Sequence, residues 1–558
     1  MRAETRTGTY PLLVLAAFLA LASVISWQAT SPNMSFEPSP DTRVLLVNNV
    51  IAQESDLLYV SDRPVISMEA VIRYLDPSAH WDEPTSTAVF TTKDRVVHMP
   101  TASLTAYVNE KPVDLSVPVS IIDGRPYVPL DFLKQLIHLS VRLVGGRVLV
   151  VDKPGTPVLE ATSISTSYVR KEPSQKSPIR AYLPEGTKLR VLSESRGYYH
   201  VLEPRGNLGF VPKQDLEMSG MYTVEESPKA ALRAWSPLGD KVVLVWEHVV
   251  SKNPDTSRIA DMGAVNVVSP TWFSISDATG TVVSRADLSY VQWAKSRGYR
   301  VWGLVENGFD PERTRAVLRN LPVRQHVIRQ LLIYAELFQL DGINLDFENM
   351  YMEDRDYYTQ FVRELVPLAK EAGLVVSVDV TFKSNSPTWS LCYDRAALAQ
   401  VADYIIVMGY DQYSGSGGRS GPVSSLNWVR AGLRVMLAEV PAEKLILGIP
   451  FYTRLWKEDG QGGKATSKAL GMRQVQELLS AKSLSPVPDA SGLKYVEYVE
   501  NGDRYRLWIE DSDSVQARTH MVWEYGLAGI AAWRRGFETP EIWDVIERTL
   551  DRDRKSGR

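Results

Sequence analysis

The chain has 558 residues, enough for three or four domains of ordinary size and for a large hydrophobic core. Lysine plus arginine total 62 and aspartate plus glutamate total 66, so the formal net charge is −4. This near balance, with 44% hydrophobic residues, excludes wholesale disorder and a polycationic nucleic-acid binder. The single cysteine, Cys392, excludes an internal disulfide and a cysteine-based zinc site. The 14 Trp and 25 Tyr are the less ordinary feature, because such rings fill cores but also stack on sugars.

The first predicted element is an export segment at residues 1–29. Arg2 and Arg6 precede an apolar run over residues 11–27, slightly short for a membrane span and slightly long for the apolar part of a signal peptide. We favour an uncleaved anchor over a cleaved signal, and a buried helix is the third alternative. Residues 30–42, rich in Ser, Pro and Asn, predict a spacer. The protein is therefore expected outside the cytoplasm, anchored in the membrane or secreted to the cell wall.

A weak internal repeat lies within residues 43–155. The stretch 62–69 resembles the stretch 124–131, which begins 62 residues later. Short amphipathic helices are predicted at 69–74 and 131–138, each followed by a β-rich stretch. The segment resembles the copper amine oxidase N-terminal-like (stalk) domain of bacterial surface proteins. No cluster of histidines accompanies the resemblance, so it does not imply copper, and we expect no metal and no cofactor.

Residues 158–218 read as short strands separated by turns. The segments 169–170, 183–186, 197–201 and 209–211 follow in an order that resembles a bacterial SH3-like domain, a small β-barrel common in cell-wall enzymes. An unrelated small β domain is the alternative. In either case we expect this module to bind or to act as a spacer, and not to catalyse.

Apolar runs alternate with helical stretches over residues 240–552, a pattern that predicts βα units and an α/β fold of the (β/α)8 TIM-barrel type. The interval 456–525 is too long for a simple crossover and predicts a small α+β insertion, with a hairpin turning at Asn501-Gly502. The eight predicted strands are 242–246, 265–269, 299–305, 343–347, 375–380, 405–408, 445–450 and 529–533.

The segment that carries chemistry is DGINLDFE, residues 341–348, at the fourth predicted strand. Side chains alternate along a strand, so Asn344, Asp346 and Glu348 share one face and the apolar residues between them share the other. Placing two carboxylates together inside a barrel costs several kcal/mol and raises the pKa of one of them. The strand end is also where barrel enzymes place their sites. The pattern therefore predicts a general acid that keeps its proton near neutral pH.

This segment is similar to the DxxDxDxE signature of family-18 glycoside hydrolases, the chitinases and endo-N-acetylglucosaminidases. Segments 407–411, 448–452 and 529–533 follow in the order that the resemblance requires. The departure is Asn344, where chitinases usually carry an aspartate, and asparagine there resembles the branch with spore-cortex and spore-germination glycosidases.

The resemblance implies substrate-assisted retention, in which the acetamido oxygen of the sugar is the nucleophile. Glu348 would act as acid and then as base, and Asp346 would orient and stabilise the oxazolinium ion. Tyr410 would hydrogen-bond the acetamido oxygen, Asp411 would support the sugar, and Trp533 would stack on it. For the two aromatic residues, packing in the barrel core is the alternative. Further candidates for substrate binding are Asn344, Asp341, Trp272, Tyr452 and Glu510.

These features together predict an exported glycosidase that cuts β-1,4 bonds after N-acetylglucosamine in peptidoglycan, attached to the cell wall through its first two modules. Two alternatives stay open: a chitinase that acts on chitin or related polymers, and a non-catalytic sugar-binding protein of the cell wall. No nucleic-acid partner is expected.

Overall fold

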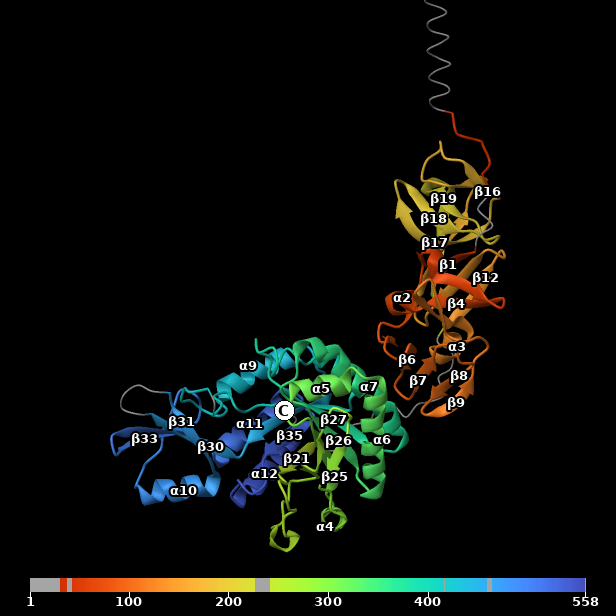
Figure 1. The fold of residues 1–558 in the computed structure, drawn as a ribbon. Coiled ribbons are helices and arrows are strands. Elements are labelled where there is room, and N and C mark those ends of the chain that lie inside the picture. The colour runs from red at the N-terminus through yellow and green to blue at the C-terminus, as the bar shows by residue number, and fades with distance from the viewer. Residues whose placement is uncertain (1–30, 38–42, 226–240, 416, 459–463, 557–558) are drawn as a thin grey trace, which may run out of the picture. The chain divides into compact units, whose positions relative to one another are not determined.

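The computed structural model describes residues 31–37, 43–225, 241–415, 417–458 and 464–556. Packing divides the chain into two compact units (Figure 1). The predicted export segment lies outside the described residues, and the described residues contain no helix long and apolar enough to cross a membrane. One unit comprises Met1–Trp81, Met99–Ala106 and Pro112–Ala230, and the other comprises Asp82–His98, Tyr107–Lys111 and Ala231–Arg558.

In the first unit the two copies of the repeat lie side by side. Strands β4 (Arg63–Ser67) and β11 (Arg125–Pro129) pair antiparallel, with Val128 opposite Ile66. Each strand leads directly into a short helix, as the repeat predicts. The helices are α2 (Met68–Ala70), continued by a π turn at Val71–Leu75, and α3 (Leu130–Leu136). The sheets contain β1 (Val44–Val47), β2 (Val50–Ile51), β3 (Leu57–Val60), β10 (Ser120–Ile122), β12 (Ser140–Val144) and β13 (Val148–Asp152).

A seven-stranded antiparallel sheet follows in the same unit, with the order β16-β15-β19-β18-β17-β14-β20. Val169, Leu183, Val201 and Val211 come from four of its strands and share one small core. The strands are β14 (Pro157–Ser163), β15 (Ser167–Arg170), β16 (Ile179–Leu183), β17 (Lys188–Ser195), β18 (Tyr198–Leu202), β19 (Leu208–Pro212) and β20 (Leu216–Thr223).

The second unit is built on a closed parallel barrel. Its sheet runs β22-β21-β35-β29-β28-β27-β26-β25, and a pairing between β22 and β25 closes it. All eight predicted strands are confirmed. Their bounds are β21 (Val242–Glu247), β22 (Val267–Pro270), β25 (Arg300–Glu306), β26 (Gly342–Asp346), β27 (Val375–Thr381), β28 (Tyr404–Met408), β29 (Leu445–Pro450) and β35 (Gly529–Trp533). A hairpin of β23 (Phe273–Ile275) and β24 (Val282–Ser284) extends the sheet beside β25.

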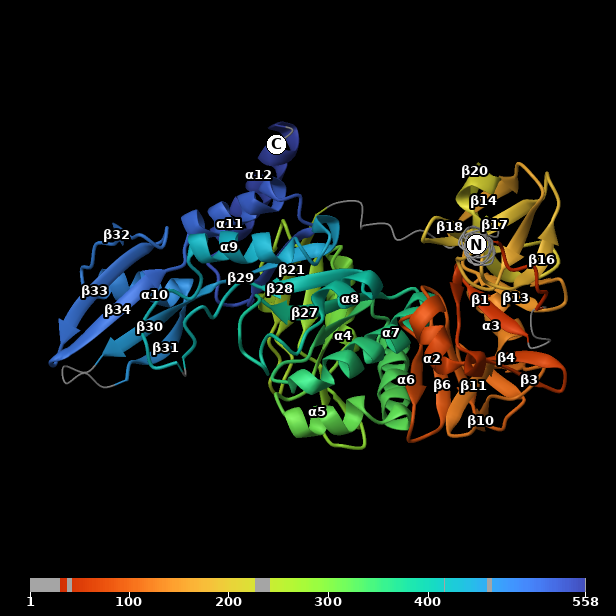
Figure 2. The same ribbon diagram turned by 90° about the horizontal axis from the view of Figure 1, so that it is seen from above.

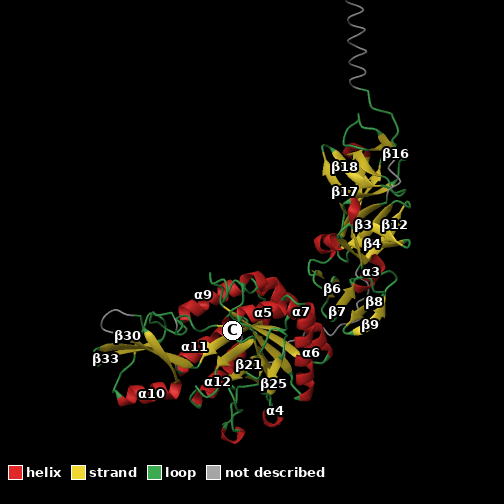
Figure 3. Cartoon of the chain, viewed as in Figure 1, coloured by secondary structure: helices red, strands yellow, loops and turns green. Residues whose placement is uncertain are grey.

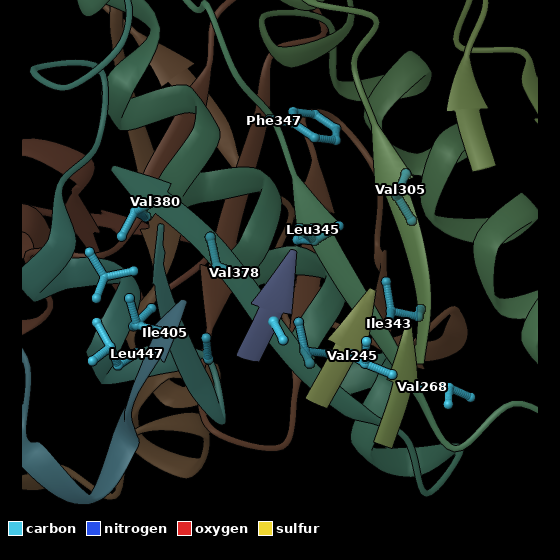
Figure 4. Close-up of a cluster of buried hydrophobic side chains, with 14 of the residues drawn as sticks. Val245, Val268, Val305, Ile343, Leu345, Phe347, Val378, Val380, Ile405 and Leu447 are labelled. Carbon is cyan, nitrogen blue, oxygen red and sulfur yellow. The ribbon is translucent and has the colours of Figure 1, made fainter. Parts of the chain in front are cut away.

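The main core lies between the barrel strands and the helices that surround them (Figure 4). Ile343, Leu345 and Phe347 of the chemistry-bearing segment join this outer layer, as strand alternation predicts. Each fully buried aliphatic side chain contributes about 1.5–3 kcal/mol relative to exposure. A second cluster fills the barrel interior and includes Trp246 and Trp302. The polar face of β26 therefore points into the barrel because its apolar face has a larger core to join.

Helices alternate with the strands around the barrel (Figure 3). Several begin at a side-chain cap: Asp287, Asp310, Asn320, Asp394 and Asp511 each accept a hydrogen bond from a backbone N–H of the first turn. The helices are α4 (Leu288–Ser296), α5 (Pro311–Leu318), α6 (Leu321–Leu337), α7 (Arg355–Glu371), α8 (Arg395–Val401), α9 (Leu426–Met436), α11 (Ser512–Glu524) and α12 (Glu541–Ser556).

The insertion follows the seventh barrel strand, as predicted, and its hairpin turns at Asn501 and Gly502, both with positive φ. Its far boundary differs from the predicted 456–525. Helix α11 belongs to the barrel, because Val515, Met521 and Val522 join the main core. The insertion (Figure 2) contains β30 (Tyr452–Glu458), β31 (Thr466–Gly471), α10 (Met472–Ala481), β32 (Val487–Pro488), β33 (Lys494–Glu500) and β34 (Asp503–Ile509).

Part of a β meander groups with the barrel and not with the first unit. Val89 and Val96 pack against Leu321 and Leu368 of helices α6 and α7. The predicted boundary of 43–155 follows the repeat, whereas packing splits that segment between the two units. The meander strands are β5 (His80–Asp82), β6 (Thr87–Thr91), β7 (Val96–Pro100), β8 (Thr105–Val108) and β9 (Lys111–Asp114).

Candidate active site

Three acids stand at one level of the barrel, on three neighbouring strands. Asp346 ends β26 and lies opposite Glu306 of β25 in the strand register. On its other side Leu345 is opposite Val378 of β27, so Asp346 and Asp379 follow one residue later on their strands. Neighbouring strands are only about 5 Å apart. The barrel thus gathers carboxyl groups at the carboxyl ends of its third, fourth and fifth strands.

These acids open into a cavity of about 990 Å³. The cavity brings together the five residues to which the sequence assigned the reaction and the stacking: Glu348, Asp346, Tyr410, Asp411 and Trp533. None of the described insertion residues lines it. Other lining residues include Trp246, His248, Arg285, Glu306, Phe309, Asp379, Lys383, Trp389 and Trp428.

Burial and mutual repulsion favour the protonated form of these carboxyls. The pKa of Glu348 is raised well above its usual value, chiefly by burial and then by the charges of Asp346, Asp379 and Asp411. Burial, and then Glu306, raises the pKa of Asp346 to about 7. Burial, and then Asp346, raises the pKa of Asp379. The environment of the site therefore shifts these carboxyls toward the protonated form, which a general acid needs.

The main chain that carries Glu348 is held from both sides. Asn307 Nδ2 donates to the Glu348 carbonyl (2.7 Å), and the Glu348 N–H donates to Asn307 Oδ1 (3.0 Å). The Tyr393 hydroxyl donates to the carbonyl of Phe347 (2.7 Å). Glu348 is thus presented to the cavity by a backbone that these hydrogen bonds hold just beyond the strand.

Asn344 is completely buried below the two acids. Its Oδ1 accepts from Trp246 Nε1 (2.9 Å) and from Ser269 Oγ (3.1 Å), and its Nδ2 donates to Asp379 Oδ1 (2.7 Å). It does not line the cavity. The predicted contact of Asn344 with substrate is therefore replaced by a supporting role beneath Asp346.

Asp411 is anchored by the first strand of the insertion. Its Oδ1 accepts from the Tyr452 hydroxyl (2.7 Å) and from Arg454 Nη2 (2.9 Å). Tyr452 is 4% exposed and is not among the cavity-lining residues. Its predicted sugar contact is thus replaced by a bond to the acid that faces the cavity.

The structure places the three remaining candidates away from the cavity. Asp341 precedes β26 at the opposite end of the barrel, where Oδ2 accepts from the Val301 N–H (2.9 Å). Trp272 is fully buried, and its Nε1 donates to Asn253 (2.7 Å). Glu510 forms a buried ion pair with Arg518 (2.6 Å). Strand direction excludes the first residue from the site, and core packing excludes the other two.

Sequence reasoning missed Asp379 and Glu306. Both lie near the ends of apolar strands, in the runs VVSVDVT and RVWGLVE. A lone acid inside an apolar strand is the available signal, since a buried charge is costly without a function or a partner. Neither residue belongs to a spaced motif, and only closure of the barrel brings them beside Asp346.

Family models match all three modules. Residues 310–538 match glycosyl hydrolases family 18, residues 47–150 match the copper amine oxidase N-terminal domain, and residues 165–217 match the bacterial SH3 domain. Among the described residues no group of three or more His, Cys, Asp or Glu side chains is placed to hold a metal ion.

Individual relatives agree with these matches. An uncharacterized glycosylase of Bacillus subtilis, YvbX, is 27% identical over 340 residues, covering 59% of this chain and 94% of the relative. The cortical fragment-lytic enzyme of Bacillus subtilis is 26% identical, covering 44% of this chain and 58% of the enzyme. A chitinase structure from Chromobacterium violaceum has a TM-score of 0.50 at 26% identity, covering 56% of this chain and 99% of the chitinase chain. The spore cortex-lytic enzyme SleL of Bacillus megaterium shares the fold, with a TM-score of 0.51 at 21% identity. The match covers 60% of this chain and 77% of the SleL chain.

The match to the family model begins at residue 310 and contains the motif with Asp346 and Glu348 and the last five strands of the barrel. The first three strands complete the same closed sheet and supply Trp246 and Glu306 to the cavity. The barrel of this chain is therefore a family 18 glycoside hydrolase domain, related to spore cortex-lytic enzymes and chitinases and joined to a copper amine oxidase N-terminal domain and a bacterial SH3 domain.

Proposed function

We propose that the protein hydrolyses β-1,4 bonds after N-acetylglucosamine in peptidoglycan, outside the cytoplasm, with retention of configuration. The observation that carries the proposal is the position of Glu348 in the cavity together with Asp346 and Tyr410, where burial and neighbouring charges raise its pKa. Membership of family 18 implies a polysaccharide that contains N-acetylglucosamine. The acetamido group of that sugar supplies the nucleophile.

In the first step Glu348 gives its proton to the glycosidic oxygen, and the bond from that oxygen to C1 breaks. The acetamido carbonyl oxygen bonds to C1 from the opposite face, forming an oxazolinium ion. Water then attacks C1 and gives a proton to the Glu348 carboxylate, while the bond between C1 and the acetamido oxygen breaks. Two inversions at C1 restore the original configuration, and the enzyme regains its proton.

The neighbouring side chains suit the charges that develop. Asp346, ionised, stabilises the positive oxazolinium ring and orients the acetamido N–H. Burial raises the pKa of Tyr410 well above its usual value, so its hydroxyl keeps the proton that it donates to the acetamido oxygen. Trp533 lies 6.0 Å from Trp246, centroid to centroid, and presents a ring for sugar stacking.

Arg285 supports peptidoglycan over a neutral polymer. It lines the cavity, is half-buried and makes no ion pair with any described residue, whereas Lys383 on the same cavity pairs with Glu439. A guanidinium without an acidic partner suits a carboxylate on the substrate. Muramoyl residues and stem peptides carry carboxylates, and chitin does not. The names of the cortical fragment-lytic relatives support the same choice.

The direct test is to incubate the chain with purified peptidoglycan and, separately, with chitin oligomers. We expect new N-acetylglucosamine reducing ends from peptidoglycan, formed first as the β-anomer in proton NMR. Glu348→Gln keeps the shape but removes the transferable proton, so turnover should fall by about 10²–10⁴.

Cleavage of chitin alone would assign the second substrate class. Sugar binding without turnover by the unmodified chain would assign a non-catalytic role. Unchanged turnover in Glu348→Gln would contradict the mechanism.

A further inference from the structure

The middle acid of the family motif is replaced by Asn344, and both the oxygen and the nitrogen of its side-chain amide make hydrogen bonds. Its oxygen accepts two hydrogen bonds, from Trp246 and Ser269, and its nitrogen donates to Asp379. An amide carries no charge and cannot exchange a proton with the neighbouring acid. Asp346 therefore has no carboxyl partner on its own strand below it.

A carboxyl stands instead on the next strand. Asp379 is one register step beyond the pair Leu345 and Val378, which places it beside Asp346 across the sheet. It is 1% exposed, and it lines the same cavity. The lost carboxyl of the fourth strand is thus matched by a carboxyl of the fifth strand, at the adjacent position of the barrel interior.

The hydrogen bond from Asn344 determines which oxygen of Asp379 carries its proton. Because Oδ1 accepts the Asn344 N–H at 2.7 Å, a proton on Asp379 resides on Oδ2. On the neighbouring strand, Asp346 Oδ1 is buried and has no hydrogen-bond partner among the described residues. A protonated Asp379 can donate a hydrogen bond to a carboxylate on the adjacent strand, whereas two ionised carboxylates at adjacent positions of neighbouring strands repel each other.

We propose that Asp379 is the positioning residue that replaces the missing middle acid, sharing one proton with Asp346 so that Asp346 stays correctly oriented when it ionises. This inference rests on the proposed function, in which Asp346 faces the acetamido group. Burial and the charge of Asp346 raise the pKa of Asp379, which agrees with Asp379 keeping the shared proton. The other titratable groups whose charge acts on Asp346 or Asp379, or is affected by theirs, are Glu306, Glu348, Tyr358, Tyr393 and Tyr410.

The test exchanges the two groups between the strands. Asp379→Asn removes the shared proton and should lower kcat by about 10–100-fold with little change in KM, because the acetamido group is misplaced in the transition state and not in binding. It should also remove one ionisation from the pH dependence of kcat. The double variant Asn344→Asp/Asp379→Asn restores one acid and one amide, and we expect kcat within about 10-fold of the native value.

Ser377 provides the matched control. It lies two residues before Asp379 on the same face of β27, is buried, and its hydroxyl has no hydrogen-bond partner among the described residues. Ser377→Ala should leave kcat and its pH dependence unchanged. Thermal denaturation of every variant separates misfolding from loss of positioning.

A second readout does not depend on turnover. Infrared titration of the carboxyl bands should show Asp346 and Asp379 losing protons in two coupled steps in the native chain. One step should disappear in Asp379→Asn and return in the double variant. Native kcat in Asp379→Asn, or a folded double variant no better than Asp379→Asn, would overturn the inference. If the native chain cleaved neither polymer, the proposed function would fail, and the titration would still decide whether the two acids share a proton.

Discussion

Glu348, Asp346 and Asp379 occupy a space where three ionised carboxylates would repel one another. Burial is the first cause of the raised pKa of each, and the charge of a neighbouring acid is the second. Protonation within this set relieves the repulsion, and a general acid is a group that still holds its proton when the reaction begins. We therefore expect kcat/KM to fall as the pH rises through the pKa of Glu348.

Ionisation of Asp346 in this buried site has a cost in stability that Asp346→Asn should reveal. The pKa of Asp346 is about 7 in the folded chain and 3.8 as its ordinary value. Below pH 4 the folded and unfolded forms are both protonated and nothing is lost, whereas between pH 4 and 7 ionisation destabilises the fold. At pH 8 the Asp346→Asn variant should melt a few degrees higher than the native chain, since each kcal/mol of stability shifts the melting temperature by roughly 2–4 °C. At pH 4 the variant and the native chain should melt at the same temperature. Equal melting temperatures at both values would contradict this, and calorimetry measures them.

Arg285 should distinguish charged from neutral substrates. Its main chain is fixed, because its N–H donates to the Trp272 carbonyl (2.8 Å) and its carbonyl accepts from Asn253 Nδ2 (2.8 Å). Removing the charge with Arg285→Gln should lower kcat/KM on muramoyl oligosaccharides by about 10-fold, the loss of one charge-assisted hydrogen bond. Activity on the same oligosaccharides with esterified carboxyls should change little.

Lys383→Gln is the control for that experiment, since Lys383 lines the same cavity but its ammonium pairs with Glu439. We expect it to affect both substrates alike. If Arg285→Gln lowered kcat/KM equally on substrates with free and with esterified carboxyls, the guanidinium would not recognise the charge of the substrate.

At the scale of elements, a buried ion pair ties α11 to the loop that carries Tyr410. Arg518 donates to both Glu510 oxygens and to the carbonyl of Ser424, whose hydroxyl donates to the Gly409 carbonyl (2.6 Å). The chain of contacts runs from the end of the insertion, through a barrel helix, to the residue before Tyr410. Glu510 is therefore linked to the backbone beside Tyr410 through Arg518 and Ser424, and its side chain does not line the cavity.

This arrangement predicts opposite behaviour for single and double replacements. Glu510→Leu leaves Arg518 buried and unpaired and should cost about 3–5 kcal/mol of unfolding free energy. Glu510→Leu/Arg518→Met removes both charges and should cost less than the single change. Urea denaturation measures both values, and a double variant less stable than Glu510→Leu would contradict the prediction.

At the scale of the whole molecule, the compact unit that contains the barrel starts before the barrel sequence. Val89 and Val96 of the meander share a core cluster with Leu321 and Leu368, and Asp82 lies 3.7 Å from Arg324, which also pairs with Glu364 (3.0 Å). These contacts lie within one unit, although about 130 residues of chain separate the meander from the barrel strands.

A chain restricted to residues 231–558 should therefore be less stable than the full chain. Removal of the meander exposes Leu321 and Leu368 to water and leaves Arg324 with one acidic partner where it had two. Thermal denaturation should show a lower melting temperature for the barrel transition, and Val96→Ala in the full chain should show a smaller loss in the same direction. An unchanged barrel transition in the shortened chain would mean that the meander contributes nothing to this unit.

Local patterns in the sequence were sufficient to predict the barrel strands and the two acids of the motif that face the cavity. The eight barrel strands could be predicted because each is a short apolar run bounded by helical stretches, and buried parallel strands require such runs. Glu348 and Asp346 could be predicted because their spacing on one strand places both on its inner face. The repeat at 62–69 and 124–131 also anticipated two equivalent strands, which pair with each other in the fold.

Only the tertiary structure decided what depends on neighbours from distant parts of the chain. It joined Asp379 and Glu306 to the site, because strand register brings them beside Asp346 from other βα units. It placed Glu510 and Trp272 outside the cavity, because Glu510 pairs with Arg518 and the Trp272 N–H donates to Asn253. The sequence gives the residue type at each position. The neighbours that determine the charge and the exposure of a side chain come from other strands, and only closure of the barrel brings them together.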